Sequence, residues 1–336
     1  MSKQEASFHA LVVREQNDGT FTRSVEERSL GDLPDHDVLV RVHYSGLNYK
    51  DGLSASGDKG VTQVFPNTPG VDAAGVVEAS RDERFSEGDR VIVTSYDLGQ
   101  NTPGGFGQYI RVPGDWIVPL PEGLTLKESM IYGSAGFTAA YGVHKIRHNG
   151  TLPEDGPVLV TGATGGVGSF AVALLSLEGY RVTAVTGKSG QGGFLEMLGA
   201  EEVAGRELVQ DTSGKPLLSS TWAGVVDTVG GEMLDTAIRQ ARHNATVTCC
   251  GNILGGDLNT SIYPFILRGV SLLGIDSGIC LMPMRRTLWN LMSDKWKLPQ
   301  LEEMYREVGL DGLNVQIDRI LEGGQVGKVL LNLKDG

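Results

Sequence analysis

A glycine-rich turn in the middle of the chain is the segment whose residue types and spacing point most directly to chemistry. It reads Gly162-Ala163-Thr164-Gly165-Gly166-Val167-Gly168, between a predicted strand at 158–161 and a predicted helix at 166–177. Glycines let the backbone approach a pyrophosphate, and a helix N-terminus offers N–H donors and the positive end of its dipole. With a strand before it, a helix after it and a further strand at the expected distance, the turn predicts a dinucleotide site rather than a turn without a ligand.

The end of the second predicted strand, at Val185, indicates which dinucleotide would bind. An NAD-selective site has Asp or Glu near this point to bind the ribose 2′-OH. This chain has Thr186, Gly187 and Lys188 there, so no carboxylate repels a 2′-phosphate and Lys188 can pair with one. Arg206, after the third strand, could reach the same phosphate. The pattern favours NADPH, although both cations are also compatible with a solvated surface position.

Two further strand ends could border the same ligand. Residues 227–231 (DTVGG) close one strand with small side chains that leave room for a nicotinamide, and residues 250–252 (CGN) close the next. Doubly wound sheets bind ligands at the carboxyl ends of their strands. Taken alone, each segment is equally compatible with an ordinary strand-to-helix turn.

The elements around these turns alternate between strand and helix. Strands are predicted at 158–161, 181–185, 224–227, 246–250 and 270–275, and helices at 166–177, 194–198 and 233–241. Such alternation predicts an α/β fold with a doubly wound parallel sheet of the Rossmann type.

The first third of the chain has a different, mostly β pattern. Short strands separated by Gly- and Pro-containing turns are predicted at 9–14, 38–44, 73–79, 90–94, 108–112 and 116–119. Their number and spacing suggest a small barrel-like domain. Thr125-x-x-Glu128 is a capping box for a helix, and a second helix is predicted at 136–148. After residue 276 we expect helices at 285–292 and 301–308, then two apolar stretches, 315–320 and 328–333, that return to the first domain as strands.

The bulk composition excludes several classes of partner. The chain has 336 residues, a formal net charge of −12 and three cysteines without metal or redox spacing. An acidic protein repels nucleic acid and anionic membranes. Its N-terminal residues lack a signal core and no apolar run approaches the roughly 18 residues that span a bilayer. We therefore expect a cytoplasmic protein with reduced cysteines and no metal.

Nine segments in one order, covering nearly the whole chain, carry a family resemblance. They are Leu47-Asn48-Tyr49-Lys50-Asp51, residues 69–77, residues 133–139, the turn 162–168, Thr186-Gly187-Lys188, residues 224–230, residues 264–268, residues 274–277 and Gly327-Lys328. Through them the chain resembles the zinc-free, quinone oxidoreductase-like medium-chain dehydrogenases/reductases, and within these most nearly the acryloyl-CoA reductase group.

The resemblance implies a GroES-like catalytic domain at 1–125 and 276–336 and a Rossmann NADPH-binding domain at 126–275, with the active site in the cleft. It also implies that Tyr49 lies at the nicotinamide and that relatives form homodimers, for which the 270–275 strand could pair with its symmetry mate. The cofactor residues that it implies are Tyr49, Thr164, Gly165, Gly166, Val167, Thr186, Gly187, Lys188, Arg206, Asn252, Ile266 and Ser277.

Zinc-dependent relatives have a cysteine near Asn48 and a Gly-His-Glu segment near Gly70. This chain reads Gly70-Val71-Asp72 and has neither ligand. Reduction of an activated double bond does not need zinc. The resemblance to the acryloyl-CoA reductase group implies hydride transfer to the β-carbon of a short 2-enoyl-CoA, with Tyr49 or water as the proton donor. Tyr49 is alternatively a packing partner of the nicotinamide.

Two cations and two other functions complete the sequence-based hypotheses. Arg285 and Arg286, at the start of a predicted helix, could bind the CoA phosphates, or could lie on a solvated helix face. Reduction of quinones or free enals and enones is a second possible function. A non-catalytic NADPH-binding sensor is a third, because a fold alone does not assign an activity.

Overall fold

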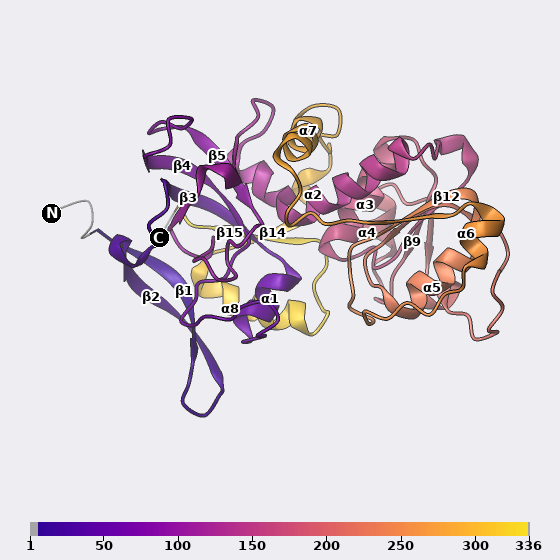
Figure 1. The fold of residues 1–336 in the computed structure, drawn as a ribbon, viewed down its shortest axis with the longest axis horizontal. Coiled ribbons are helices and arrows are strands. Elements are labelled where there is room, and N and C mark those ends of the chain that lie inside the picture. Colours follow the sequence, from indigo (N-terminus) through magenta and orange to yellow (C-terminus); the bar gives the residue numbers. More distant parts are fainter. Residues whose placement is uncertain (1–5, 335–336) are drawn as a thin grey trace. The chain divides into compact units, whose positions relative to one another are not determined.

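The computed structural model describes residues 6–334, which form two compact units (Figure 1). Unit 1 consists of the chain up to residue 134, residues 278–294 and the chain from residue 301; unit 2 consists of Ala135–Ser277 and Lys295–Gln300. The sequence-based division places 295–300 in the other domain. These residues belong to unit 2 because Trp296 is buried there and its indole N–H donates to Glu178 at 2.6 Å.

Unit 2 contains a six-stranded parallel sheet in the order β10-β9-β8-β11-β12-β13. This is the strand order of a doubly wound dinucleotide-binding fold, with the order reversing between β8 and β11. The strands are β8 (Val158–Val160), β9 (Val182–Val185), β10 (Glu202–Ala204), β11 (Trp222–Asp227), β12 (Ala241–Cys249) and β13 (Ser271–Gly274).

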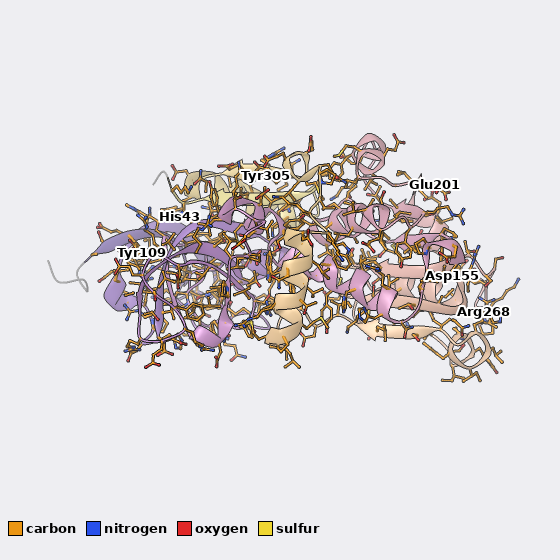
Figure 2. All side chains as sticks on the ribbon, turned by 90° about the horizontal axis from the view of Figure 1, so that it is seen from above. His43, Tyr109, Asp155, Glu201, Arg268 and Tyr305 are labelled. Atoms are coloured by element: carbon orange, nitrogen blue, oxygen red, sulfur yellow. The ribbon has the colours of Figure 1, made fainter. Side chains whose placement is uncertain are left out.

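The central strands of this sheet are buried along their whole length, as expected for strands covered on both faces. The helices of the unit are α3 (Gly166–Leu177), α4 (Gly192–Met197), α5 (Gly231–Arg239) and α6 (Tyr263–Arg268) (Figure 1). Arg268, labelled in Figure 2, ends α6 and donates its guanidinium to the carbonyls of Leu218, Arg239 and Ala241, which ties the helix to the unit.

Unit 1 is built on a seven-stranded sheet and a separate hairpin. The sheet order is β14-β15-β3-β4-β5-β7, with β6 also pairing with β3, and all pairs except β14–β15 are antiparallel. The hairpin is β1 (Ser7–Glu15) and β2 (Phe21–Ser29). The remaining elements are β3 (Val38–Leu47), α1 (Tyr49–Ala55), β4 (Asp72–Ser80), β5 (Arg90–Thr94), β6 (Tyr109–Val112), β7 (Ile117–Pro119), α7 (Met282–Ser293), β14 (Tyr305–Val308), α8 (Leu310–Leu321) and β15 (Lys328–Asn332).

Helix α2 (Leu126–His148) begins in unit 1 and is interrupted at Gly133, where φ is 50° and ψ is −156°. Its start confirms the predicted capping box. The Glu128 amide donates to Thr125 Oγ1 at 3.1 Å and the Thr125 amide donates to Glu128 Oε2 at 2.8 Å. The interruption restarts the helix at Ser134, so the Ser134 N–H is directed to a side chain instead of to the preceding turn.

Two predictions for the C-terminal part were wrong. Residues 301–308 form a short 3-10 turn and strand β14 instead of a helix, and 315–320 lie within helix α8 instead of a strand. In α8, Leu313 and Ile317 are fully buried at a spacing of four, which is a helical period that the short apolar window concealed. The prediction also omitted β2, α1 and α6, and it gave no bounds for the third strand of the sheet, β10. No helix between residues 6 and 334 is long and apolar enough to cross a membrane.

Candidate functional site

The glycine-rich turn follows β8 and leads into α3. Gly162 has a φ of 59°, and a Cβ there would collide with the Thr228 hydroxyl and lie 2.8 Å from Val229 Cγ1. Gly165 is the N-cap of α3, and a Cβ on Gly168 would collide with the Gly162 carbonyl. Thr164, Gly165, Gly166 and Val167 therefore form a tight backbone turn at a helix N-terminus, which is the geometry that receives a pyrophosphate.

Hydrogen bonds join the turn to the loop after β11, at the point where the strand order reverses between β8 and β11. Thr161 Oγ1 donates to Asp227 Oδ1 at 2.7 Å, and the Gly230 N–H donates to Asp227 Oδ2 at 2.8 Å. Thr228 Oγ1 donates to the Thr161 carbonyl at 2.8 Å. Burial raises the pKa of Asp227, whose side chain is inaccessible. Asp227 thus holds the two loops together and does not present its carboxylate to a ligand.

The residues predicted to meet a 2′-phosphate lie together at the end of β9. The Thr186 hydroxyl accepts from the Lys188 N–H at 3.1 Å and is 3.0 Å from the Thr164 hydroxyl. The guanidinium of the exposed Arg206 packs so closely on Gly187 that a Cβ there would collide with it. Two cationic residues and two hydroxyls gathered at this loop fit a phosphate dianion.

The remaining three predicted cofactor residues lie on separate segments of unit 2. Asn252 is exposed in the loop after β12, and Ile266 is 64% exposed on α6. Ser277 accepts a hydrogen bond at 2.7 Å from Thr138 Oγ1 of α2. Their roles beside a ribose or nicotinamide stay predictions.

In unit 1 the structure brings together four segments that carry the family resemblance. Asp72 and Lys328 are completely buried, and their carboxylate and ammonium are 3.3 Å apart. Lys328 Nζ donates to Asn48 Oδ1 at 2.7 Å, and Asn48 Nδ2 donates to Asp72 Oδ2 at 2.8 Å. Ser134 donates to Asp72 Oδ1 from its amide at 2.9 Å and from its hydroxyl at 2.6 Å. We call Asn48, Asp72, Ser134 and Lys328 the buried polar cluster.

Tyr49, the predicted catalytic residue, is the first residue of α1 and follows the cluster member Asn48 directly. Its side chain is half-buried and Lys50 is exposed. Asp51 accepts from the Asn48 amide at 2.7 Å and from the Val71 amide at 2.8 Å, which fixes the first turn of the helix. The start of α1, and with it Tyr49, is therefore attached to the cluster.

Sequence reasoning missed Asp72, Ser134 and Lys328 as members of a site. A signal was present, since Asp72 stands in an apolar stretch and Lys328 opens an apolar strand, and charged residues are almost never fully buried unless paired. The pattern does not reveal the partner, because Lys328 and Asn48 are 280 positions apart in the chain.

Asp51 should make stability depend on pH. Burial, and next the neighbouring Asp72, raise the pKa of Asp51 to about 6. A carboxyl whose pKa is raised by folding stabilises the fold fully below its unfolded pKa, and this contribution is lost as the pH rises through about 6. As the pH rises from 4 to 7, the wild type should lose on the order of 2–3 kcal/mol relative to Asp51→Asn. Urea unfolding of both proteins across this range checks it, and a difference independent of pH would contradict it.

Arg285 does not suit the predicted contact with CoA phosphates. It is completely buried in unit 1, where Nη1 donates to Thr94 Oγ1 at 2.7 Å and Nη2 donates to the Gly278 carbonyl at 3.1 Å. Its guanidinium also lies 4.6 Å from the centre of the Tyr96 ring. The prediction that Arg285 binds the CoA phosphates is corrected, because its guanidinium donates its hydrogen bonds to groups inside unit 1. Arg286 is exposed, and a contact between its side chain and the CoA phosphates stays a prediction.

Two models of known protein families match the chain. Residues 34–122 match the alcohol dehydrogenase GroES-like domain, and residues 166–293 match the zinc-binding dehydrogenase family. The second name raises the question of a metal. Between residues 6 and 334, no three His, Cys, Asp or Glu side chains are grouped so that they could hold a metal ion. The buried polar cluster contains an ammonium group beside its carboxylate, so its donor set does not fit zinc.

Relatives match over almost the whole chain. The chain is 47% identical over 327 residues, 99% of the relative's length, to "Putative quinone oxidoreductase YhfP" of Bacillus subtilis, and 42% identical over 99% of its length to acrylyl-CoA reductase AcuI of Ruegeria pomeroyi. The solved structure of the YhdH oxidoreductase of Salmonella enterica in complex with NADP has 40% identity and a TM-score of 0.94. The match covers 97% of this chain and all of that structure.

The solved structure of Bacillus subtilis YhfP with NAD bound has 46% identity and a TM-score of 0.95, and 98% of this chain covers it completely. Two domain models in the expected order and full-length similarity at these identities establish the family. The chain belongs to the medium-chain dehydrogenases/reductases, in their quinone oxidoreductase-like branch.

Proposed function

We propose that the protein is an NADPH-dependent reductase of the C=C bond of a short 2-enoyl-CoA, with acryloyl-CoA as substrate and propanoyl-CoA as product. The observation that carries the substrate class is the full-length similarity to the acrylyl-CoA reductase of Ruegeria pomeroyi. It agrees with the residues of the site, where a glycine-rich turn, a helix N-terminus and a basic loop are available for a phosphorylated dinucleotide.

The choice of NADPH rests on the loop after β9. Lys188 and Arg206 supply positive charge there, and Thr164 and Thr186 supply hydroxyls. An NAD-selective carboxylate is missing from this loop in the sequence. Because one relative has been solved with NAD and two with the phosphorylated form, we expect a preference for NADPH with residual use of NADH.

NADPH, when bound, supplies the hydride that adds to the β-carbon of the enoyl thioester. Negative charge then develops on the thioester oxygen, where donors must stabilise it, and the α-carbon requires a proton. Tyr49 is the proposed donor of that proton from its hydroxyl, and the exposed Lys50 supports it electrostatically. Solvent returns the proton to Tyr49 after the product leaves.

Tyr49→Phe is the direct test of this proton donor. We expect kcat to fall about 100-fold, within the usual contribution of a positioned acid, with the KM for NADPH unchanged. Steady-state kinetics with acryloyl-CoA measure both parameters. Turnover close to that of the wild type would instead give the proton to water and leave Tyr49 as a packing residue.

Arg286 is proposed to contact the phosphates of CoA. Arg286→Glu should raise the KM for acryloyl-CoA about tenfold, since charge-assisted contacts to phosphate contribute about 1.5–3 kcal/mol when well formed and less when solvated. The KM for NADPH should not change. Arg306→Glu, at an exposed position of strand β14, is a control with the same change in net charge. An unchanged KM for acryloyl-CoA in Arg286→Glu, or an equal increase in both variants, would remove the assignment.

Reduction of quinones is the second candidate function. It is favoured by the 47% identity to the Bacillus subtilis relative, whose name carries that activity. The two candidates differ in what the substrate offers to the protein, since a quinone lacks the phosphate charges of CoA. A quinone reductase would therefore be indifferent to Arg286→Glu.

The experiment that tests the proposal follows NADPH oxidation at 340 nm with acryloyl-CoA, crotonyl-CoA, a quinone and an enone in parallel, each repeated with NADH. A kcat/KM highest for acryloyl-CoA with NADPH is the expected result. Turnover restricted to the quinone or the enone would transfer the proposal to the second candidate. Binding of NADPH without any turnover would indicate a cofactor-binding sensor.

We further propose that the enzyme is a homodimer formed through unit 2. Strand β13 is an edge of the described sheet, and several exposed apolar side chains precede it in the chain, including Ile253, Ile262, Ile266 and Leu267. An exposed edge strand beside an apolar surface is a pairing site for a second copy. Light scattering at micromolar concentration should give twice the mass of the chain, and a monomer mass would contradict this proposal.

A further inference from the structure

We propose that Lys328 is a positioning residue for the reaction. Its buried ammonium fixes the side-chain amide of Asn48, and through Asn48 it holds Tyr49 at the start of α1. This inference rests on the proposed function for the role of Tyr49. The placement of α1 by Lys328 is a separate physical claim that can be measured without any substrate.

Lys328 is held in a location that a lysine occupies only with compensation. Its side chain is completely buried, although lysine is almost never fully buried without a partner. Its ammonium reaches Asn48 Oδ1 at 2.7 Å and Asp72 Oδ2 at 3.3 Å. The shorter contact is to the amide rather than to the carboxylate, so the ammonium does more than neutralise Asp72.

The contact from Lys328 determines which way the Asn48 amide faces. With Oδ1 bound to the ammonium, Nδ2 points to Asp72 Oδ2 at 2.8 Å and to the Gly46 carbonyl at 3.1 Å. Nδ2 also donates to Asp51 Oδ2 at 3.1 Å. Without the ammonium, Oδ1 loses its donor and the side chain is held through Nδ2 alone. Asn48 directly precedes Tyr49, the first residue of α1, and its side chain is tied to the first turn through the contact from Nδ2 to Asp51.

The ammonium of Lys328 also affects the buried carboxylate of Asp51 in the first turn of α1. The neighbouring carboxylate of Asp72 adds to burial in raising the pKa of Asp51, and Lys328 opposes this effect. The Asp51 carboxylate in turn accepts hydrogen bonds from the backbone N–H groups of Asn48 and Val71. Loss of the ammonium would therefore weaken the acceptor that holds the first turn of α1, in addition to releasing the Asn48 side chain.

The backbone near the cluster leaves room for this lysine. A Cβ at Gly46 would lie 2.7 Å from Lys328 Cε and 2.9 Å from its Nζ, and a Cβ at Gly133 would lie 3.1 Å from Nζ and collide with Asp72. Gly133 also adopts a positive φ of 50°. Two separate elements thus lack side chains where the buried pair passes, as expected when the position of the pair has to be exact.

The test uses full-length protein with the Lys328→Met/Asp72→Asn double variant as the main variant, because Lys328→Met alone leaves a buried carboxylate uncompensated and can fail to fold. The double variant removes both charges and keeps similar side-chain volumes. Lys59→Met, an exposed lysine of unit 1 whose side chain is 51% accessible, is the matched control.

Hydrogen–deuterium exchange is the first readout and needs no substrate. We expect the amides of residues 48–55 to exchange faster in the double variant. Apart from the substituted ends of β4 and β15, the sheet of unit 1 should be unchanged, as should all of unit 2, and Lys59→Met should show no change. Unchanged exchange at 48–55, or faster exchange throughout unit 1, would overturn the positioning role.

Kinetics give the second readout. In the double variant kcat should fall about 10- to 100-fold, the scale produced by small misplacements of a reacting group, while the Kd for NADPH stays constant. Tyr49→Phe should cost much less in this background than in the wild type, because Tyr49 is already misplaced. Equal costs in both backgrounds would overturn the link to Tyr49. If the wild type reduces only quinones, the same cycle with a quinone separates failure of the enoyl-CoA proposal from failure of this inference.

Discussion

Replacing Gly162 by valine should weaken NADPH binding by about 100-fold or more. A side chain at a φ of 59° costs about 1–2 kcal/mol, and crowding against Thr228 and Val229 adds about 1–3 kcal/mol. The turn can relieve this strain by moving away from the N-terminus of α3, which removes the backbone donors from the pyrophosphate. A loss of about 3 kcal/mol corresponds to this change in Kd. Titration of NADPH fluorescence measures it directly.

Gly150→Ala is the matched control for strain alone. Gly150 also has a positive φ, 90°, in unit 2, but nothing lies within 4 Å of a Cβ there. Its variant should lower the melting temperature by a few degrees, about the effect of 1 kcal/mol, with the Kd for NADPH unchanged. If Gly162→Val binds NADPH as the wild type does, the turn is not the pyrophosphate site.

Arg206→Ala should lower the preference for NADPH over NADH by about 10- to 100-fold. Loss of a charge-assisted contact to the 2′-phosphate should reduce kcat/KM for NADPH by about 10- to 100-fold, given that Arg206 is exposed and partly screened by solvent. NADH has no such phosphate, and its kcat/KM should stay within about twofold of the wild type. Paired initial-rate measurements with both cofactors give the ratio.

Arg181→Ala separates this effect from a general loss of positive charge. Arg181 is exposed, just before β9, whereas Arg206 packs on Gly187 after the end of that strand. Its variant has the same change in net charge and should leave both cofactor constants unchanged. A fall for NADH as large as the fall for NADPH in Arg206→Ala would show that Arg206 maintains the loop and does not read the phosphate.

The doubly wound unit was predictable because its evidence is local. The turn at 162–168 is a continuous segment between a strand and a helix, and the basic loop at 186–188 follows the next strand directly. Helix α3 has the predicted bounds, 166–177, for the same reason. Each of these features depends on residues within about ten positions of one another, which is the range over which hydrophobic periodicity and turn chemistry operate.

The buried polar cluster was not predictable in the same way. Asp72, Ser134 and Lys328 were each part of segments that carried the resemblance, yet nothing in one segment specifies the other two. Arg285 illustrates the opposite error. A basic residue at a helix start suggests a surface position, but Thr94 and Gly278, which accept its hydrogen bonds, come from a strand and a loop elsewhere in unit 1. Tertiary partners decided both outcomes.

The cluster has a consequence for the order in which a newly made chain can fold. Unit 2 is almost continuous in sequence, so its parallel sheet can close once residue 277 has left the ribosome. Unit 1 begins earlier but is completed later, because β15 inserts beside β3 and brings the lysine that compensates Asp72. Domains usually fold from the N-terminus during synthesis. Here the first unit to be translated waits for the last strand, with a buried carboxylate left without its cation until then.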